Sequence, residues 1–424
     1  MYQAPRGTAD ILPSEQRYWN YIKEKSAALC HLYGYQRIDT PVFEDVHLFA
    51  RTNTPGTDIV DKEMYTFTDM GGQQLALKAE GTAPICRAYL EHGFANSPQP
   101  VRLYYLGPTF RYERPQAGRS RQHHQFGCEA LGDDDPLLDA EIIEMAWQFL
   151  LSLDLSALSL QMNSIGCKSC RPDYIAALKH YYLEHVSQLC PDCQSRMEKK
   201  PLRLLDCKRP ACQKIAEGAP KSTDYLCADC GTHFRSVQQY LEHLGIPFRV
   251  NHHMVRGLDY YTRTVFEFQP TEEGGQSTIG AGGRYDDLIS QLGGQPSPGV
   301  GFAFGIERII LNLQRQGVDI PHTPPPQVMI AHLGQQGKLA AITLASRLRR
   351  TGISVVTATG NKSLKSQLRH ANTLTVGHVI IIGTQEIKDE SIILRDMQSG
   401  EQELLPLEGI DIALRAKLQS SSLY

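Results

Sequence analysis

The chain has 424 residues, 41% of them hydrophobic, which is enough to bury more than one core, so we expect about two to four domains. Its 43 Lys and Arg nearly balance its 46 Asp and Glu, and the net charge of −3 does not by itself indicate a nucleic-acid partner. No stretch reaches the apolar length of a membrane helix, and residues 1–7 lack the layout of a secretory signal. We therefore expect a cytoplasmic protein with no membrane partner.

The first part of the chain predicts a helix followed by strands. Residues 14–32 are compatible with a helix that ends at Gly34, and residues 36–43 are strand-like. Residues 101–112 and 121–131 are rich in β-branched and aromatic side chains, and they flank a loop at 114–119. These two segments predict an antiparallel hairpin.

Sheet signals continue on both sides of a cysteine-rich stretch. A helix at 139–153 and a strand at 158–162 precede it, and strands at 264–268 and 299–304 and a helix at 306–316 follow it. Between them, helix-compatible pieces at 173–185 and 234–244 indicate a separate, mostly helical insert at about 166–246. We therefore expect residues 1–325 to form an α+β domain on an antiparallel sheet that carries this insert.

A proline-rich linker separates the last hundred residues from the rest. Residues 321–326 hold four prolines, a composition typical of a stiff linker. Beyond it, strands at 328–331, 353–356 and 379–382 alternate with helices at 338–350 and 364–372, which predicts an α/β domain over residues 326–424. No Asp or Glu occurs between Ile320 and Gln385, so this region is basic although the whole chain is not; its cations are Lys338, Arg347, Arg349, Arg350, Lys362, Lys365 and Arg369.

Eight of the eleven cysteines lie between Cys167 and Cys230. They form four pairs, three of which have the spacing of zinc knuckles: Cys167 with Cys170, Cys190 with Cys193, Cys207 with Cys212, and Cys227 with Cys230. A disulfide framework is not expected in a cytosolic chain. Two four-cysteine zinc sites can be built from these pairs, and a set of reduced, partly buried thiols is the alternative, so the sequence leaves metal binding open.

The predicted hairpin carries side chains of both charge signs on one surface. Alternate residues of a strand share a face, so Arg111 and Glu113 point one way, as do Gln125, Gly127 and Glu129. An arginine fork fits phosphate, and a carboxylate beside it can hold an amine. The pattern therefore suits an amino acid beside a nucleotide triphosphate; an exposed hairpin with cross-strand ion pairs is the alternative.

Three further segments have the same mixture of glycine, charge and hydroxyl groups. Alternating glycines within the strand at 299–305 indicate close approach by a backbone or a flat ligand, and they lie in the strand rather than in the turn that a dinucleotide site needs. Residues 256–262 place a cation beside two tyrosines, and residues 80–82 place a carboxylate and a hydroxyl before a helix. A surface turn and a helix cap are their respective structural alternatives.

In combination, these segments resemble the class II aminoacyl-tRNA synthetases. The three signatures of that class occur in order: a helix and strand ending in Thr40-Pro41, residues 110–129, and residues 299–308. Segments 6–10, 80–82, 256–262 and 282–286 are similar to those of histidyl-tRNA synthetases in particular. The resemblance covers essentially the whole chain. It implies ATP-dependent activation of L-histidine to histidyl-adenylate and transfer to the 3′ end of tRNA(His).

The resemblance also implies roles for individual residues. Glu80, Thr82 and Gln125 would hold the α-amino end of histidine, Glu129 and Tyr261 would read its imidazole, and Tyr260 and Tyr285 would line the same pocket. Arg111 and Arg308 would bind ATP phosphates, Glu113 would lie near the adenine, and Arg256 would touch the histidine carboxylate and the α-phosphate. The catalytic residues would thus be Arg256 and Arg111. Arg114, Gln116 and Arg119 would meet the acceptor end of the transfer RNA.

The implied partners are tRNA(His), L-histidine, ATP with Mg²⁺, and a second copy of the chain, bound through the N-terminal catalytic domain. The C-terminal α/β domain would bind the anticodon. The chain departs from the family pattern at His123, which replaces an aromatic ring near the adenine. A second family remains as an alternative, the non-catalytic regulatory subunit of ATP phosphoribosyltransferase. The intact segment 256–261 and the domain after Pro326 count against it.

Overall fold

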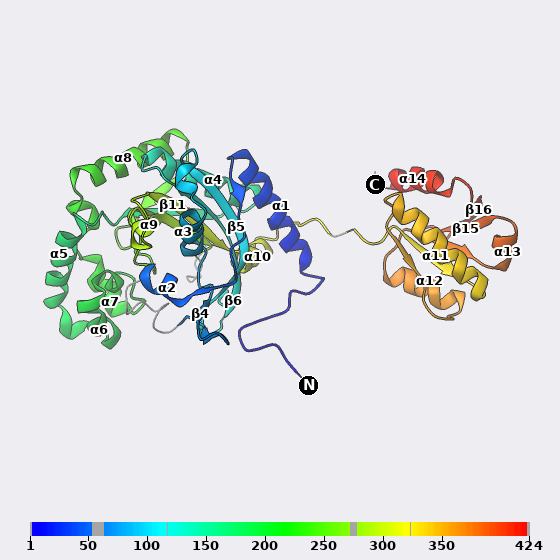
Figure 1. Ribbon diagram of the computed structural model, residues 1–424, viewed down its shortest axis with the longest axis horizontal. Coiled ribbons are helices and arrows are strands. Elements are labelled where there is room, and N and C mark those ends of the chain that lie inside the picture. The colour runs from blue at the N-terminus through cyan, green and yellow to red at the C-terminus, as the bar shows by residue number, and fades with distance from the viewer. Residues whose placement is uncertain (1, 53–62, 117, 272–277, 323, 422–424) are drawn as a thin grey trace. The chain divides into compact units, whose positions relative to one another are not determined.

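The computed structural model describes residues 2–52, 63–116, 118–271, 278–322 and 324–421 (Figure 1). Residue 117 of the expected loop, residue 323 of the expected linker and the last three residues lie outside this range. The chain divides into two compact units, Met1–Pro321 and His322–Tyr424. Among the described residues, no helix is long and apolar enough to cross a membrane.

The first unit is built on an eight-stranded sheet with strand order β1-β5-β6-β11-β10-β9-β7-β8. Its strands are β1 (Gln36–Arg37), β5 (Val101–Phe110), β6 (Gln122–Leu131), β7 (Leu158–Ser164), β8 (Phe248–Val250), β9 (Thr262–Pro270), β10 (Gly280–Arg284) and β11 (Gly299–Gly305). Neighbouring strands are antiparallel except at the two edges, where β1 pairs with β5 and β7 with β8 in parallel. The predicted α+β fold on an antiparallel sheet is confirmed.

Four helices cover one face of this sheet: α1 (Gln16–Leu32), α4 (Pro136–Ser152), α8 (Ala228–His243) and α10 (Ile306–Arg315). Alternate strand residues point into this layer, so Phe126, Phe302 and Phe304 lie in its core. The ring centroids of Phe126 and Phe149 of α4 are 4.6 Å apart. The residues that alternate with these phenylalanines along the same strands therefore face the opposite side of the sheet, where they can form a site.

The opposite face carries α3 (Thr82–Glu91), α2 (Val46–Thr52), α9 (Leu288–Gln291) and a small antiparallel sheet, β2-β4-β3. Its strands are β2 (Phe43–Asp45), β3 (Thr66–Thr68) and β4 (Gln74–Leu77). The single strand predicted at 36–43 was wrong, because the chain changes sheets there. The Ile38 N–H still bonds to the β5 backbone at Tyr104, whereas the Val42 carbonyl already accepts from Lys78, which follows β4.

The insert between β7 and β8 is mostly helical, as predicted. It contains α5 (Arg171–Leu183), α6 (Pro191–Lys199) and α7 (Pro210–Glu217), together with three short 3₁₀ turns, η3 (Val186–Gln188), η4 (Pro201–Leu204) and η5 (Ser222–Tyr225). These elements share a small core of their own around Tyr174, Leu178 and Tyr182. Helix α8 instead buries Phe234 and Val237 in the main core, so the insert is joined to the sheet at its C-terminal end.

The second unit is a five-stranded sheet, β13-β12-β14-β15-β16, with helices on both faces. The elements are β12 (Val328–His332), α11 (Gly334–Arg350), β13 (Val355–Thr357), α12 (Leu364–Thr373), β14 (His378–Ile382), α13 (Thr384–Lys388), β15 (Ser391–Asp396), β16 (Gln402–Pro406) and α14 (Ile410–Ser421). Strands β12, β13 and β14 are parallel and β15 and β16 are antiparallel, so the predicted α/β domain has a partly parallel sheet. Helices α11 and α14 cover one face and α12 the other.

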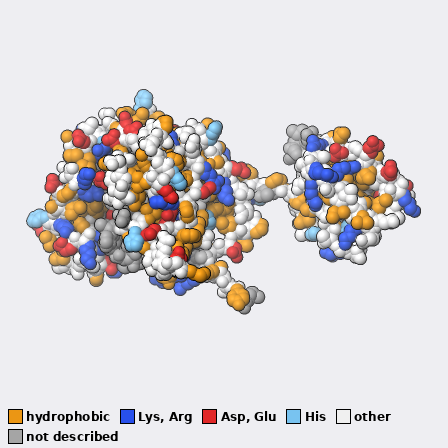
Figure 2. Space-filling view, viewed as in Figure 1, with side chains coloured by type: hydrophobic (Ala, Val, Ile, Leu, Met, Phe, Trp, Pro, Cys, Tyr) orange, Lys and Arg blue, Asp and Glu red, His pale blue; other side chains and the backbone are white. Residues whose placement is uncertain are grey.

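Some basic residues of this unit form hydrogen bonds within the fold, and others are exposed on its surface. Arg347 donates to the Leu407 carbonyl at 2.7 Å, and Arg349 donates to that of Val355, so both are part of the fold. Lys362, Lys365 and Arg369 are exposed on α12 and the loop before it. Figure 2 shows lysine and arginine side chains over α11 and α12 on the visible face.

A buried ion pair ties the sheet to α4. The Arg284 guanidinium at the end of β10 is fully buried, and it donates to Asp139 Oδ2 of α4 from Nε at 2.9 Å and from Nη2 at 2.5 Å. The other oxygen of Asp139 lies 3.0 Å from Nε2 of His233 on α8. Burial acts to raise the pKa of Asp139, but the Arg284 charge and the His233 hydrogen bond outweigh it and lower this pKa to about 2.

We predict that Asp139→Asn lowers the free energy of unfolding of the first unit by about 3 kcal/mol or more, because it leaves Arg284 buried without its main counter-charge. Both tryptophans, Trp19 and Trp147, lie in this unit, so their fluorescence during urea unfolding reports on it. Asp134→Asn, an exposed residue in the loop before α4, is the matched control.

The same carboxylate should make stability depend on pH. Because the folded-state pKa of Asp139 is about 2 and its ordinary value is 3.8, its contribution is present above pH 4. That contribution, about 2 kcal/mol, should be lost as the pH falls from 4 to 2. Asp139→Asn should remove this part of the acid dependence. Equal behaviour of the two Asn variants would contradict the assignment.

Candidate active site

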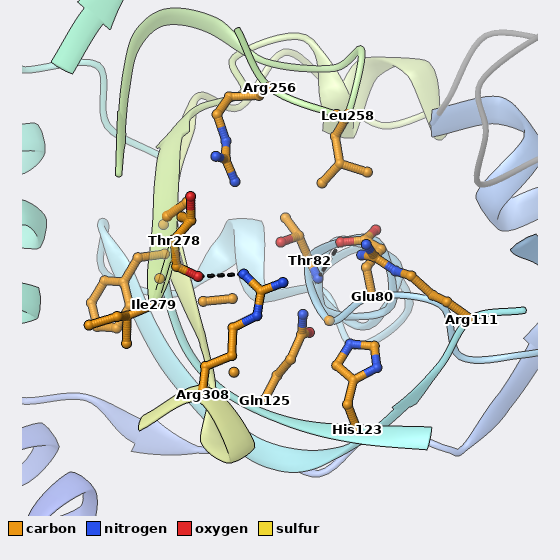
Figure 3. A pocket seen from close by; sticks show the side chains of 18 of the residues that line it. Glu80, Thr82, Arg111, His123, Gln125, Arg256, Leu258, Thr278, Ile279 and Arg308 are labelled. Carbon is orange, nitrogen blue, oxygen red and sulfur yellow. Dashed lines mark hydrogen bonds between the residues drawn. The ribbon is translucent and has the colours of Figure 1, made fainter. Parts of the chain in front are cut away.

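A pocket lies on the face of the main sheet that the four core helices leave open (Figure 3). Its lining includes ten of the eleven residues that the sequence assigned to the site, from segments more than two hundred residues apart: Glu80, Thr82, Arg111, Glu113, Gln125, Arg256, Tyr260, Tyr261, Tyr285 and Arg308. The eleventh, Glu129, is buried directly beneath and bonds to two of them. The structure thus brings every one of these candidates together.

Glu80 is held at the N-terminus of α3. Its two carboxylate oxygens accept the backbone N–H groups of Thr82 and Ala83, each at 2.9 Å, and one also accepts the Tyr260 hydroxyl at 3.1 Å. Burial raises the pKa of Glu80, and these hydrogen bonds oppose the rise. A helix N-terminus stabilises a negative charge, so the carboxylate is fixed in position and orientation.

Glu129 is the most deeply buried acid of the site, with 1% of its surface exposed. Its Oε1 accepts the Thr82 hydroxyl at 2.7 Å, and its Oε2 accepts the Tyr285 hydroxyl. Burial, helped by the nearby Glu80, raises the pKa of Glu129 to about 8 even though both hydrogen bonds oppose the rise. At neutral pH the unliganded carboxyl group is therefore mostly protonated, and a ligand that brings a hydrogen-bond donor or a positive charge favours its ionised form.

Glycines of the two central strands leave space for the side chains of the site. A Cβ on Gly301 would lie 1.9 Å from Glu129 Oε2, one on Gly127 would lie 2.5 Å from the Tyr105 ring, and one on Gly299 would lie 2.4 Å from the Tyr285 ring. The sequence predicted close approach to β11 by a backbone or a flat ligand. The structure shows close approach, but the nearest groups at Gly299 and Gly301 are the side chains of Tyr285 and Glu129.

Gln125 and Tyr261 complete the polar floor. Gln125 Oε1 is buried and has no hydrogen-bond partner among the described residues, so an acceptor stands ready for a ligand's donor. Burial raises the pKa of Tyr261 to about 12, so its hydroxyl keeps its proton and acts as a donor.

Three arginines point into the pocket from different elements (Figure 3). Arg111 Nε donates to the Ala79 carbonyl at 2.9 Å, and Arg308 donates to the carbonyls of Gly118 at 3.1 Å and Thr278 at 2.5 Å. Arg256 Nη1 donates to Glu267 Oε2 at 2.9 Å, while its Nε is buried with no partner among the described residues.

His123 lines the pocket beside Arg111. Burial first, and then the charges of Arg111 and Arg308, lower the pKa of His123 to about 3, so its ring is neutral. A neutral imidazole can stack on a flat base.

Some details of the site differ from the sequence prediction. Strand β5 ends at Phe110, so Arg111 and Glu113 follow the strand rather than belong to it, although both still line the pocket. Sequence reasoning also missed Glu267, the partner of Arg256. No local signal marks this pairing, because Glu267 of β9 meets Arg256 only through the path of the chain between them.

Outside the pocket, the eight cysteines of the insert form two groups that could hold a metal ion. One group consists of Cys167, Cys170, Cys227 and Cys230, and the other of Cys190, Cys193, Cys207 and Cys212.

Comparison with known proteins agrees with this geometry. A family model described as histidyl-tRNA synthetase matches residues 7–169 and 183–309, and one described as an anticodon binding domain matches residues 327–417. A curated relative from Dehalococcoides mccartyi, named histidine–tRNA ligase, is 56% identical over 418 residues, which cover 99% of this chain and 100% of the relative.

Solved structures give the same result. The crystal structure of the apo histidyl-tRNA synthetase of S. aureus matches with a TM-score of 0.82 and 36% identity, over 98% of this chain and 100% of that one. A Bacillus halodurans structure described as an ATP phosphoribosyltransferase regulatory subunit/histidyl-tRNA synthetase is similar in fold, with a TM-score of 0.66 at 23% identity, over 90% of this chain and 98% of that one. With a family model over more than half its length and a 56% identical relative over nearly all of it, the chain belongs to the histidyl-tRNA synthetase family.

Proposed function

We propose that the pocket joins L-histidine to the α-phosphate of ATP and then transfers the histidyl group to the 3′ end of tRNA(His). The observation that carries this proposal is the pairing of a buried, partly satisfied acid, Glu129, with three arginines in one pocket. The acid suits an imidazole, and the arginines suit a nucleotide triphosphate.

The α-amino end of histidine fits between Glu80, Thr82 and Gln125. An ammonium group brings three donors, and Glu80 and Gln125 Oε1 are acceptors that protein groups leave partly or wholly available. The helix N-terminus keeps Glu80 in place while it accepts from the ligand.

The imidazole fits against Glu129 and Tyr261, with Tyr260 and Tyr285 beside it. A ring N–H can donate to the Glu129 carboxylate and the Tyr261 hydroxyl can donate to the other ring nitrogen, so both nitrogens are recognised. An apolar side chain of similar size would leave both protein groups buried without partners, which is a costly state.

The chemical step needs fixed cations rather than a base. A carboxylate oxygen of histidine attacks the α-phosphorus, and the bond to pyrophosphate breaks, so negative charge builds up on the phosphate oxygens. Arg256 would contact both the histidine carboxylate and the α-phosphate, and Arg111 and Arg308 would bind the ATP phosphates, whose remaining charge Mg²⁺ would help to neutralise. Glu113 and His123 are then placed for the adenine.

The transfer RNA is proposed to contact both units. The segment around Arg114, Gln116 and Arg119 adjoins the pocket, where Arg119 forms part of the lining, so it is placed for the acceptor end. The second unit corresponds to the predicted domain over residues 326–424. We propose that it binds the anticodon through exposed cations.

We also propose a homodimer formed through the catalytic domain, in the cytoplasm, where transfer RNAs are charged for the ribosome. The first class II signature ends at Thr40-Pro41, and directly after it Val42 and Phe43 are exposed, with Phe67 of β3 beside Phe43. An exposed apolar patch of this kind favours a protein partner.

The regulatory-subunit alternative predicts no adenylate formation. Pyrophosphate exchange into ATP, measured with each amino acid in turn, tests the proposed function: exchange that depends on histidine supports it, and absence of exchange with every amino acid supports the alternative.

We predict that Glu129→Ala lowers kcat/KM for histidine in pyrophosphate exchange by at least about 10³-fold, because the carboxylate that recognises the imidazole is removed. Glu129→Gln, which keeps the shape and one acceptor, should lose less. Gly301→Ala should raise the KM for histidine, since its methyl group would lie 1.9 Å from Glu129 Oε2. Folded Glu129→Ala enzyme with unchanged activity and preference would remove Glu129 from the proposal.

We predict that Arg256→Ala slows single-turnover adenylate formation by about 10²–10³-fold, with a much smaller effect on ATP binding, because a preorganised donor is lost. Arg256→Lys should restore little, since the two-pronged geometry is gone. Glu267→Gln is the matched control: it breaks the Arg256–Glu267 ion pair but keeps the cation. If Glu267→Gln reproduces the effect of Arg256→Ala, or if Arg256→Ala lowers only the melting temperature, the role of Arg256 is structural.

We predict that reversing the charges of Lys362, Lys365 and Arg369 together lowers kcat/KM for tRNA(His) by at least about tenfold and leaves pyrophosphate exchange intact. The logarithm of the affinity should also fall less steeply with the logarithm of the salt concentration. This slope should decrease by roughly one unit for each RNA phosphate that these cations bind in the unaltered protein. Lys388→Glu, on α13 at the other face of the sheet, is the control. Unchanged charging by the triple variant would contradict binding of the anticodon by α12.

A further inference from the structure

Eight cysteines of the insert converge into two compact groups. We name them the first cluster (Cys167, Cys170, Cys227 and Cys230) and the second cluster (Cys190, Cys193, Cys207 and Cys212). Within each cluster, all four sulfur atoms lie within 4.8 Å of one another. The first cluster joins two segments about sixty residues apart, before α5 and at the start of α8.

The distances between sulfur atoms match a shared tetrahedral ion. Four sulfur atoms at the usual Zn–S distance of about 2.3 Å lie about 3.8 Å from one another. The observed Sγ–Sγ distances are 3.8 Å for Cys167 and Cys170, 4.0 Å for Cys167 and Cys227, and 3.9 Å for Cys190 and Cys207. A disulfide would require a bond of about 2.05 Å. Four sulfur ligands at tetrahedral spacing are typical of structural zinc.

The backbone around the clusters also favours metal-bound thiolates. Cys170, Cys190 and Cys227 directly precede helices α5, α6 and α8, whose N-termini stabilise negative charge. The backbone N–H of Cys167 donates to Cys170 Sγ at 3.3 Å, and that of Cys190 donates to Cys212 Sγ at 3.3 Å. These features occur in both clusters.

The glycine before the first cluster is adapted to it. Gly166 has a φ of +70°, and a Cβ there would lie 2.7 Å from Cys170 Sγ. Only glycine adopts this conformation without strain and leaves room for the sulfur atom.

We propose that each cluster binds one Zn²⁺ ion, and that the ion in the first cluster positions the histidine-binding residue Tyr261. The second part of this proposal rests on the proposed function, whereas the first part does not.

The link from the first cluster to the pocket is a set of hydrogen bonds through Arg171, the residue after Cys170. Its guanidinium donates to the Ile165 carbonyl at 3.1 Å, the Gly166 carbonyl at 3.0 Å and the Tyr261 carbonyl at 2.6 Å. The Gly166 carbonyl also accepts the Arg263 N–H at 2.9 Å. The loop that carries the first cluster is therefore bound directly to the backbone of Tyr261 and Arg263, and an ion that fixes this loop fixes Tyr261 as well.

The second cluster has different surroundings. Cys193 and Cys212 belong to the core of the insert itself, with Tyr182 and Leu204. The helices α6 and α7 that carry them have nine and eight residues, too short to be stable alone, so a metal ion can supply much of their folding free energy. Loss of this ion should disturb the insert core, against which Val255 beside Arg256 also packs, but it should leave the Arg171 hydrogen bonds to Tyr261 in place. The second cluster therefore serves as an internal control for the histidine KM.

The metal sites are tested first on the intact chain, purified without chelators. Elemental analysis should give about two zinc ions per chain. Exchange into Co²⁺ should produce the absorption bands of tetrahedral tetrathiolate cobalt. Protein with neither zinc nor cobalt bands would overturn the proposal and leave the eight cysteines as reduced thiols; this measurement needs no variant.

Paired substitutions then separate the clusters. Cys167→Ser with Cys227→Ser should remove one ion and raise the KM for histidine in pyrophosphate exchange by about tenfold, with the KM for ATP nearly unchanged. Cys190→Ser with Cys207→Ser should also remove one ion but leave both KM values unchanged. Circular dichroism spectra check that each variant is folded.

Arg171→Met tests the connection itself. It should keep both ions and still raise the KM for histidine about tenfold, because a charged hydrogen bond to the Tyr261 carbonyl is removed. Arg171→Lys, which keeps a donor, should restore part of the affinity. If first-cluster variants lose their ion and keep the histidine KM, or if both cluster pairs raise it equally, the positioning role is wrong even though the metal sites stand.

Discussion

The two-residue period of the central strands is the constraint on which the pocket depends. In β6 and β11 one set of residues, including Phe126 and Phe304, faces the helices, and the set between them faces the ligand side. Bulky rings on the first face fix the sheet against four helices, while glycines on the second leave space for the side chains of the site, Gly301 for Glu129 and Gly299 for Tyr285. A shift of register by one residue would exchange the two faces and remove both the core and the site.

The ion pair between Arg284 and Asp139 applies the same constraint to β10. Arg284 stands on the helix side, where Asp139 and His233 hold it, so its neighbour Tyr285 must face the pocket and reach Glu129. A buried pair of this kind contributes little net stability compared with an apolar contact, but breaking it is costly. Its consequence here is geometric, because it determines the side of the sheet on which Tyr285, the residue after β10, presents its hydroxyl to Glu129.

Much of this arrangement could be predicted from the sequence, because the segments that form it carry local signals. The hairpin at 101–131, the glycine strand at 299–305 and the tyrosine pair at 260–261 each have a period or composition that a single strand or loop explains. The split of residues 36–43 between two sheets could not be predicted in this way, since it depends on which strand each half meets in space. Neither could the partnership of Arg256 with Glu267, for which the curvature of the loop after Arg256 must be known. The spacing of the cysteines left their grouping open, and only the fold brings residues 167–170 to residues 227–230.

The charges of the pocket are arranged so that it is complete only with its ligands. Arg111 and Arg308 are held through backbone carbonyls, which orient a guanidinium without neutralising it. Burial, and then the neighbouring cations Arg119, Arg111 and Arg256, lower the pKa of Arg308, although Glu113 opposes the shift. Under the proposed function, the phosphates of ATP would bring negative charge to these guanidinium groups, and partial burial would make each contact stronger than in water. On the other side of the pocket, burial keeps the pKa of Glu129 near 8 until a donor arrives. The two halves therefore differ in chemistry, with fixed cations at one end and a buried acid that ionises only when a donor meets it at the other. Under the proposed function, the phosphates would lie at the first end and the imidazole at the second, and the histidine carboxylate would lie between them, next to Arg256, where attack on the α-phosphate would occur.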